Sequence, residues 1–237
     1  TKFHTSHQNI VSQRYLITKN TPESDPLTAQ PPFELPNIDI TIVTYNNGKW
    51  IKGFTESLLK QNYPLSKIFI YFVDNNSTDD TLDILTKETK KLIDNGCEIN
   101  ITKSNHNNGF GAGHNLAIKA GTSPFCLISN IDLTFDQDAI INIVSTACAD
   151  QSNVATWELR QKPYEHPKFY DPVTGTTNWN SHACILMRRK AIEQINGYDE
   201  NIFMYGEDVE MSYRLRQSGY LLRYCPKAVV YHYSYEH

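Results

Sequence analysis

The stretch IDITIVT, residues 38–44, decides the fold. Its β-branched residues predict a buried strand, and a helical pattern follows over residues 48–61. The same alternation continues as far as residue 149. The further strands are expected at 67–73, 98–103 and 125–129, and the further helices at 77–95, 111–121 and 136–149. Strands that alternate with helices imply an α/β fold with a largely parallel sheet and helices on both faces.

The ends of the chain carry weaker patterns. Residues 1–37 are rich in proline and poor in periodicity, which predicts an N-terminal arm or linker with at most a short strand near 12–18. After Val154 the pattern loosens into a loop-rich, aromatic region over 161–180. Further strands are expected near 183–187, 221–224 and 229–233, and further helices near 189–195 and from Glu207. We therefore expect one domain over 38–237, with halves at 38–135 and 136–237.

The composition is that of an ordinary soluble globular protein. Of 237 residues, 40% are hydrophobic and 20% charged, and the net charge of −4 comes without a basic block, so duplex nucleic acid is not an expected partner. No apolar run approaches the ~20 residues of a membrane span. The five cysteines are scattered and form no Cys-x-x-Cys pair, which argues against a disulfide framework and predicts a reducing cytoplasm. Because the chain begins at Thr1, we expect it to be a piece of something longer.

Polar residues follow three of the predicted strands. These strand ends read Thr44-Tyr45-Asn46-Asn47, Asp74-Asn75-Asn76-Ser77 and Asn130-Ile131-Asp132. Turns favour Asn and Asp for their own reasons, but the carboxyl ends of parallel strands meet at one sheet edge, where ligands bind. Asp132 at such an edge can hold a hard divalent cation. His232 is either a half-buried histidine or, if it meets Asp132 in space, a second ligand.

Residues 77–80 and 107–115 carry local helix-start signals. Ser77 with Asp80 resembles a capping box. The stretch NNGFGAGHN, residues 107–115, is a glycine-rich turn between a strand and a helix, where backbone N–H groups can approach a phosphate. Its spacing differs from the dinucleotide fingerprint G-x-G-x-x-G, and it follows the third strand rather than the first. A tight loop that requires glycine stays open as the alternative.

The acidic stretch FMYGEDVEMSYR, residues 203–214, places Glu207, Asp208 and Glu210 in the first turn of a helix. A helix N-terminus favours negative charge, so an acidic first turn without a catalytic role is the simpler alternative. An ionised carboxylate is also what a general base requires. Glu210 is expected to pair with Arg214 one turn on.

Together these motifs resemble the inverting family-2 glycosyltransferases of the GT-A fold, over about residues 38–237. Residues 44–46 and 73–79 resemble the nucleotide motifs of the first two strands, and 108–115 resembles the motif Asn-x-Gly-Phe-x-x-Gly-x-Asn. Residues 206–208, Gly-Glu-Asp, resemble the acidic motif that carries the catalytic base. The resemblance implies a Rossmann-like, mostly parallel sheet flanked by helices, with a C-terminal acceptor-side subregion.

Two departures from the family pattern matter. Asn130 stands where the family has the first aspartate of Asp-x-Asp, so one strong carboxylate ligand is left and metal binding depends more on His232. Residues 180–184, NSHAC, lack the glycine that relatives often have before the small residues. The acceptor-side wall is therefore expected to differ.

The resemblance implies a nucleoside-diphosphate sugar as donor and a saccharide or lipid-linked saccharide as acceptor. Asp208 is implied as catalytic base with Glu207 in support, and Asp132 with His232 as the site of a divalent cation, Mg²⁺ or Mn²⁺. The residues implied in donor binding are Thr44, Tyr45, Asn46, Asp74, Asn75, Gly109, Gly113, Asn115, Asn130 and Asp132, and those implied on the acceptor side are Trp179 and His182. Residues 204–216 with the late His232 are similar to bacterial rhamnosyltransferases of surface polysaccharides, which favours dTDP-rhamnose over a UDP-hexose.

The implied place of action is the cytoplasm, at the inner face of the membrane if missing regions bind it. Other classes stay open. A non-catalytic carbohydrate-binding or pseudo-glycosyltransferase module of a multidomain polymerase is favoured by Asn130 and disfavoured by Glu207-Asp208. A nucleotidyltransferase would be expected to have a glycine-rich loop after the first strand, and residues 44–48 are poor in glycine. A dehydrogenase fits least, because the dinucleotide fingerprint is absent from the sequence.

Overall fold

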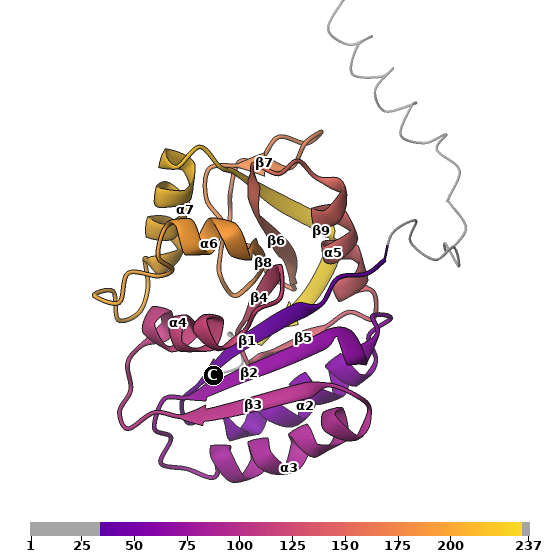
Figure 1. Cartoon of the computed structure of the whole chain (residues 1–237), viewed down its shortest axis with the longest axis vertical. Helices are drawn as coiled ribbons and strands as arrows, with labels where there is room; N and C mark the ends of the chain where they lie inside the picture. The colour runs from indigo at the N-terminus through magenta and orange to yellow at the C-terminus, as the bar shows by residue number, and fades with distance from the viewer. Residues whose placement is uncertain (1–33, 234–237) are drawn as a thin grey trace, which may run out of the picture. The chain divides into compact units, whose positions relative to one another are not determined.

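Nine strands form one mixed sheet in the order β3-β2-β1-β4-β8-β6-β9-β5, with β7 paired to β9. They lie within residues 34–233, which are the residues that the computed structural model describes (Figure 1). The predicted arm over residues 1–37, with its short strand near 12–18, falls almost wholly outside these residues. The predicted α/β fold is confirmed over the described part of the domain.

The first half of the sheet contains the four parallel strands that the alternation predicts. β1 lies between β2 and β4, so Ile38 has Ile68 on one side and Phe125 on the other. A short 3₁₀ turn, η1 (Leu65–Lys67), precedes β2. The bounds in this half are β1 (Ile38–Thr44), α2 (Gly48–Leu59), β2 (Ile68–Asp74), α3 (Thr81–Asp94), β3 (Glu98–Lys103), α4 (Phe110–Ala120) and β4 (Phe125–Ser129).

The capping box expected at the start of α3 is wrong. The helix begins at Thr81 with Asp80 as its N-cap residue, whose side chain makes no capping hydrogen bond, and Asp79 Oδ1 accepts the N–H of Thr81 (3.0 Å) instead. Ser77 instead donates its hydroxyl hydrogen and its backbone N–H to the Asp74 carboxylate. Ser77 therefore belongs to the turn that closes the end of β2, and the helix starts only after that turn.

The second half of the sheet is mostly antiparallel. β8 runs antiparallel to β4 and β6, and β9 runs antiparallel to β5 and β7, while β6 and β9 are parallel. The bounds in this half are β5 (Leu133–Phe135), α5 (Ala139–Ala149), β6 (Val154–Lys162), β7 (Thr176–Thr177), β8 (Cys184–Arg188), α6 (Arg189–Gln194), α7 (Glu207–Gln217) and β9 (Leu221–His232). Parallel pairing is thus confined to β1–β4 and to the β6–β9 pair.

The sequence does not predict the strand β6, where the pattern loosens. Its residues are nevertheless almost all buried, including the polar Thr156, Glu158 and Gln161. Thr156 Oγ1 donates to Asn180 Oδ1 (2.7 Å) and Gln161 Nε2 donates to Ser181 Oγ (3.1 Å), so their polar atoms have partners. Buried polar residues interrupt the hydrophobic periodicity on which a strand prediction depends.

The two strands expected near 221–224 and 229–233 form one strand, β9. Pro226 lies in its middle, and proline has no N–H to give to a ladder. The structure accommodates it at an irregularity, because β6 pairs with Cys225 and then directly with Val229. The continuous strand carries His232 to the carboxyl edge of the sheet.

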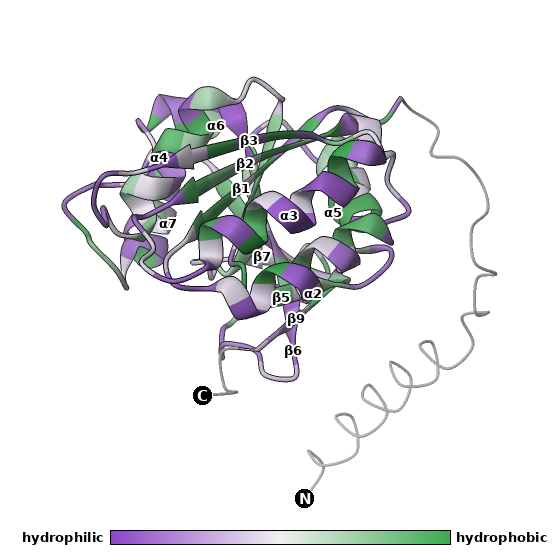
Figure 2. Cartoon of the chain, turned by 90° about the horizontal axis from the view of Figure 1, so that it is seen from below, coloured by the Kyte–Doolittle hydropathy of each residue, from purple (hydrophilic) through white to green (hydrophobic). Residues whose placement is uncertain are grey.

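Helices cover both faces of the sheet: α2, α3 and α5 lie on one face, and α4, α6 and α7 on the other (Figure 1 and Figure 2). Two apolar clusters result. One joins Ile40 of β1 to Phe54 of α2, and the other joins Ile128 of β4 to Ile192 of α6 and Leu215 of α7. Between residues 34 and 233 there is no helix with the length and apolar character that crossing a membrane requires.

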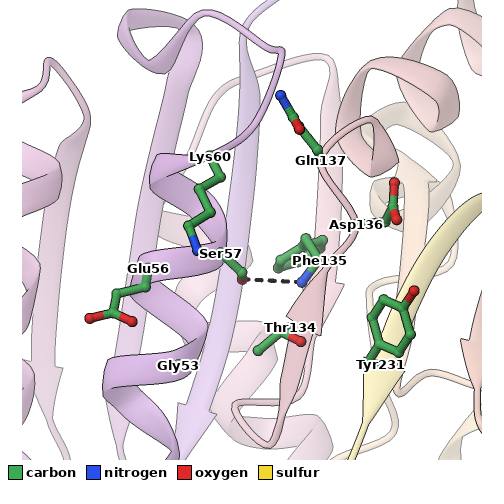
Figure 3. Close-up of a pocket in the computed structure, with 9 residues that line it drawn as sticks. All are labelled: Gly53, Glu56, Ser57, Lys60, Thr134, Phe135, Asp136, Gln137 and Tyr231. Carbon is green, nitrogen blue, oxygen red and sulfur yellow. Dashed lines mark hydrogen bonds between the residues drawn. The ribbon is translucent and has the colours of Figure 1, made fainter.

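The helix α2 also closes the free edge of β5, the last strand of the sheet. Ser57 Oγ accepts a hydrogen bond from the backbone N–H of Phe135 (3.1 Å), as Figure 3 shows. Beside this contact lies an open pocket of about 570 Å³, lined by Glu56, Lys60 and Gln137 among others. Its described lining includes none of the candidate site residues.

A buried ion pair ties β1 to α6, and breaking it should destabilise the fold strongly. The Asp39 carboxylate accepts hydrogen bonds from Arg189 and from the N–H (3.0 Å) and hydroxyl (2.6 Å) of Ser123. Asp39 is 1% exposed and Arg189 8%. Arg189→Met leaves the Asp39 charge buried without its cation, so we expect the free energy of unfolding in urea to fall by about 3–5 kcal/mol.

The matched control is Lys190→Met, an exposed position on the same helix, whose unfolding free energy should change by no more than about 0.5 kcal/mol. A similarly small change for Arg189→Met would contradict the structural role of the pair.

Candidate active site

A pocket of about 520 Å³ lies at the carboxyl ends of β4, β6 and β9, beside the start of α7. Residues far apart in the chain share its wall: Asn130, Asp132, Gln161, His182, Glu207, Asp208 and His232. Asp132, from the predicted first half of the domain, and Glu207 and Asp208, from the second half, therefore line one cavity. Of the three polar strand ends expected to converge, only Asn130-Ile131-Asp132 contributes to the described lining of this pocket.

One part of this pocket brings Asp132 and His232 together. His232 Nε2 lies 3.3 Å from Asp132 Oδ1, and Asn130 Nδ2 lies 3.5 Å from the same nitrogen. Gln161 Oε1 lies 2.9 Å from His232 Nδ1, while Gln161 Nε2 donates to Ser181 Oγ. Because an amide oxygen only accepts, His232 Nδ1 carries a hydrogen and Nε2 presents its lone pair. Gln161 thereby fixes the orientation of the imidazole.

In the neutral imidazole the Nε2 lone pair faces the Asp132 carboxylate at 3.3 Å. Two acceptors this close are stabilised by a shared cation, either a proton on the imidazole or a metal ion between the two groups. The donor set fits a divalent cation, since carboxylates suit Mg²⁺ and Mn²⁺. No group of three or more His, Cys, Asp and Glu side chains able to hold a metal occurs within residues 34–233. Asp132 and His232 could supply two ligands of a cation, and substrate oxygens and water would have to supply the others.

The first turn of α7 carries the acidic pair. Tyr205 and Gly206 have left-handed backbone angles, φ +68° and +97°, and the helix begins at Glu207. Glu207 is 8% exposed. Burial raises the pKa of Glu207, and the nearby Asp208 charge adds to the shift. Asp208 is half-buried, and its Oδ1 accepts the N–H of Val209 (2.8 Å).

The third acid of the motif is engaged in the structure. Arg214 Nη2 donates to Glu210 Oε2 (2.6 Å), which is the predicted pair one turn on. Arg214 Nη1 also donates to the carbonyl of Ile195 (2.7 Å). Glu210 therefore stabilises α7, and Glu207 and Asp208 are the acids that line the pocket.

Two uncharged histidines lie near this pocket. His182 is 3% exposed, and its Nδ1 lies 2.9 Å from the Tyr198 hydroxyl oxygen. His114 is fully buried, with its Nδ1 2.9 Å from Thr41 Oγ1. Burial lowers the pKa of each to about 3. His182 lines the pocket, whereas His114, which the sequence did not single out, packs behind it against the rings of Phe110 and Tyr198.

We expect acid to destabilise the fold through these two histidines. A histidine in an unfolded chain has a pKa of about 6.5, whereas His114 and His182 have values of about 3 in the fold. Between these values the unfolded state binds more protons, so the free energy of unfolding falls as the pH drops from about 6.5 toward 3. We expect the free energy of unfolding, measured in urea at stepwise lower pH, to fall less steeply with pH for His114→Gln than for wild type. The control His106→Gln changes an exposed histidine and should keep the wild-type pH dependence. Equal slopes in all three proteins would contradict the prediction.

The polar ends of β1 and β2 form a separate cluster. Asp74 is fully buried, and Thr44 Oγ1 donates to its Oδ1 (3.2 Å). The backbone N–H of Asn46 donates to Ser77 Oγ (3.0 Å), which links the two strand ends. Tyr45 is 46% exposed. The Asp74 carboxylate thus holds the strand ends together, and Tyr45 and Asn46 present the surface that a ligand can reach.

Packing explains the glycine-rich turn, as the tight-loop alternative predicts. Gly109 has φ +82°, and a Cβ there would lie 2.1 Å from the carbonyl oxygen of Phe203. A Cβ at Gly113 would lie 2.7 Å from the Val43 side chain, because α4 crosses β1 closely. Neither glycine lines the candidate pocket. Close packing therefore accounts for both glycines, and the contact of this turn with a donor phosphate stays a prediction.

Asn115 also has structural partners. Its Oδ1 accepts the N–H of Tyr198 (2.9 Å) and its Nδ2 donates to the carbonyl of Tyr198 (2.9 Å), so it joins α4 to the segment before α7. It does not line the candidate pocket. Asn75 Nδ2 donates to the carbonyl of Gly109 (2.9 Å), while its buried Oδ1 has no partner among residues 34–233.

Trp179 packs behind the pocket wall rather than in it. Lys168 Nζ lies 4.4 Å from its ring centre, and the His166 ring lies 6.1 Å away. Lys168 forms a buried ion pair with Glu158, which anchors the loop that carries Tyr164 and His166 to the pocket. The sequence predicts an aromatic loop here. Tyr164 and His166 reach the pocket because they directly follow β6, a strand that the sequence does not predict.

The fold and the site define a class of protein, a glycosyltransferase domain of the GT-A type. The mannosyltransferase PcManGT from Pyrobaculum calidifontis, solved with GDP-Man and Mn²⁺, matches with a TM-score of 0.70 at 18% identity, over 95% of this chain and 65% of that one. TarS from S. aureus, solved with UDP-GlcNAc, matches with a TM-score of 0.69 at 19% identity, over 82% of this chain and 58% of that one. At this identity the likeness shows the fold.

The chain belongs to glycosyl transferase family 2, whose model matches residues 39–196. It is 27% identical over 221 residues to the O-antigen chain rhamnosyltransferase WbaN of Salmonella anatum, covering 84% of this chain and 66% of that protein. It is 43% identical over 64 residues to the N-acetylglucosaminyl-diphospho-decaprenol L-rhamnosyltransferase of Mycobacterium tuberculosis, covering 27% of this chain and 21% of that protein. The chain thus spans between 21% and 66% of the length of these curated relatives. The predicted family is confirmed.

Proposed function

We propose that this protein is an inverting glycosyltransferase that moves a sugar from a nucleoside-diphosphate donor to a hydroxyl group of a saccharide acceptor. The observation that carries the proposal is that Asp132, His232 and Asp208 line one pocket. A leaving diphosphate requires positive charge, and an attacking hydroxyl requires a base. The proposed cation ligands and the proposed base therefore lie in the same cavity, where one bound donor sugar could contact both.

Asp132 and His232 are the residues proposed to hold Mg²⁺ or Mn²⁺. Their donor atoms lie 3.3 Å apart, and Gln161 keeps the His232 lone pair available for the ion. When bound, the cation would neutralise negative charge that develops on the leaving diphosphate. The mannosyltransferase with the same fold was solved with Mn²⁺, which supports the choice of ion.

Asp208 is proposed as the base. It accepts the proton of the acceptor hydroxyl, whose oxygen attacks the anomeric carbon from the face opposite the leaving diphosphate, so that the configuration inverts in one step. The first turn of α7 supports this role, because the N-terminal end of a helix favours the ionised carboxylate. Glu207 is proposed to contact the sugar beside it.

The donor is proposed to be dTDP-rhamnose, with UDP-hexoses as the second choice. Similarity to two rhamnosyltransferases supports rhamnose, and the UDP-GlcNAc complex of TarS supports a uridine nucleotide. The exposed Tyr45 and Asn46, beside the buried Asp74, are the proposed contacts of the base and ribose. The acceptor is proposed to be a saccharide or lipid-linked saccharide of a cell-surface polysaccharide, and a lipid-linked one would bring the enzyme to the inner face of the membrane.

Donor binding can be tested by thermal unfolding with Mn²⁺ and single nucleotide sugars. At a concentration 100 times its Kd, a ligand adds about 2.7 kcal/mol of stability. For a domain of this size we expect Tm to rise by roughly 5–10 °C with dTDP-rhamnose and by less with UDP-glucose, UDP-GlcNAc or GDP-mannose. A larger rise with a UDP-sugar would correct only the donor. The absence of any rise with every nucleotide sugar would contradict the proposed function.

A further inference from the structure

Two buried polar atoms in the wall of the candidate pocket have no hydrogen-bond partner among residues 34–233. They are His182 Nε2 and Glu207 Oε2. His182 is 3% exposed and Glu207 8%. Buried polar atoms in folded proteins are almost always hydrogen-bonded, and each exception requires an explanation. Two exceptions in one pocket indicate a ligand that supplies both partners.

The Tyr198 hydroxyl determines what His182 offers to that ligand. Tyr198 is 3% exposed, and His182 Nδ1 is its partner at 2.9 Å. If Nδ1 donated to the phenol, the hydroxyl hydrogen of Tyr198 would need a second acceptor, and the described residues supply none. Tyr198 is therefore the donor, so Nδ1 accepts. A neutral imidazole carries one hydrogen, which must then be on Nε2, so the buried Nε2 of this pocket-lining residue is an N–H donor without a described partner.

Glu207 offers the complementary group. Glu207 is the first residue of α7 and directly follows the left-handed turn at Tyr205 and Gly206. Its Oε2 is buried in the same pocket wall and is an acceptor. One fixed donor and one fixed acceptor together match a hydroxyl group, which accepts one hydrogen bond and donates another.

The neighbours of these two residues indicate whose hydroxyl it is. His182 precedes Ala183, whose carbonyl accepts the N–H of Asn130 (2.8 Å), so it adjoins the strand end that carries Asp132. Glu207 directly precedes Asp208, the proposed base. A sugar in transfer must lie between the leaving diphosphate and the base. His182 adjoins the proposed diphosphate side of the pocket, and Glu207 adjoins the proposed base.

We infer that His182 and Glu207 bind one hydroxyl group of the transferred sugar, with His182 Nε2–H donating to its oxygen and Glu207 Oε2 accepting its hydrogen. The inference rests on the proposed function and adds a sugar-recognition site to it. The role proposed for His182 therefore differs from the sequence-based expectation: it contacts the donor sugar rather than the acceptor. The alternative occupant is a trapped water, which also donates and accepts.

The test compares two ligands that differ only by the sugar. Calorimetry in Mn²⁺ measures the Kd of the nucleotide sugar that wild type binds best among dTDP-rhamnose, UDP-glucose, UDP-GlcNAc and GDP-mannose, and the Kd of the matching nucleoside diphosphate. We expect His182→Phe and Glu207→Gln each to weaken nucleotide-sugar binding about tenfold or more, the usual loss for a hydrogen bond that involves a buried polar group. Binding of the nucleoside diphosphate should change less than about twofold, since it lacks the hydroxyl.

Two further variants keep the test decisive if His182→Phe fails to fold. His182→Gln keeps an N–H donor at a similar reach and should retain most of the sugar-dependent affinity. Tyr198→Phe removes the hydroxyl that fixes Nδ1 and should weaken nucleotide-sugar binding alone. A purely structural role would lower both affinities in parallel, and a trapped water would leave both unchanged; either result overturns the inference. If wild type binds neither the sugars nor their diphosphates, the proposed function itself has failed.

A monodeoxy series locates the hydroxyl. For wild type, one deoxy analogue of the preferred nucleotide sugar should bind about tenfold or more weakly than its parent, because the buried donor and acceptor lose their partner. In His182→Phe the same analogue should bind about as well as the parent. Equal binding of every deoxy analogue by wild type would overturn the inference.

Discussion

Asp208→Asn should lower the rate of nucleoside-diphosphate release about 1000-fold while the Kd of the nucleotide sugar stays within about twofold of wild type. The amide keeps the size of the carboxylate but cannot accept the acceptor proton. Asp208 lines the pocket and is half-buried, so the change neither empties the core nor removes a partner from a buried ion pair. Turnover is measured with the nucleotide sugar that binds best, and binding by calorimetry.

The matched control is Glu210→Gln on the same helix. Glu210 is bonded to Arg214 and is absent from the described pocket lining, so its loss should cost stability rather than turnover. Near-normal turnover of Asp208→Asn with the donor still bound would reject Asp208 as the base. Glu207→Gln would then become the next variant to test for that role.

Asp132→Ala should remove the effect of Mn²⁺ on donor affinity. In wild type we expect Mn²⁺ to tighten nucleotide-sugar binding about 10- to 100-fold over EDTA, because the ion screens the diphosphate from the acidic pocket. Without Asp132, His232 is the remaining strong ligand and cannot hold the ion alone. Calorimetry with and without Mn²⁺ gives the two affinities for each protein.

The control for this change is Asp136→Ala, a carboxylate four residues further along that lines the separate pocket beside α2. It should keep the wild-type response to Mn²⁺. Equal donor binding with and without the ion in wild type would show that Asp132 and His232 hold no metal that the donor needs.

The sequence was sufficient where residues follow a simple periodic rule. The first strand, predicted from IDITIVT, runs over Ile38–Thr44 in the structure, and the fourth runs over Phe125–Ser129 as predicted. Both strands are buried on two faces, so their residues are almost uniformly apolar or β-branched. The Glu210–Arg214 pair was predictable for the same reason, since it depends only on helical spacing.

The sequence was insufficient where buried polar residues replace apolar ones. The strand β6 contains Glu158 and Gln161, whose burial depends on partners from the segment 180–181 that no local pattern shows. Because the sequence does not predict β6, it also does not predict that Gln161 lies beside His232 and orients its imidazole. Conversely, Asn115 looked like a ligand contact because its structural partner, Tyr198, is distant in sequence.

Glycine was ambiguous for a physical reason. A glycine allows close approach of any group, and the sequence does not say which group approaches. At Gly109 and Gly113 the structure shows a carbonyl and a valine where a Cβ would lie, so close packing requires both glycines. His232, in contrast, is a predicted ligand only if it lies beside Asp132. The pairing of β5 with β9 brings the two side chains to 3.3 Å.

The most direct test of the account is the release of nucleoside diphosphate from single nucleotide sugars by the wild-type protein in Mn²⁺, with a saccharide acceptor or water as the nucleophile. We expect one sugar, dTDP-rhamnose first among the candidates, to be turned over, and both EDTA and Asp208→Asn to abolish the release. A protein that binds a nucleotide sugar in Mn²⁺ but releases no diphosphate from any of them would contradict the account. That result would indicate a sugar-binding module in place of an enzyme.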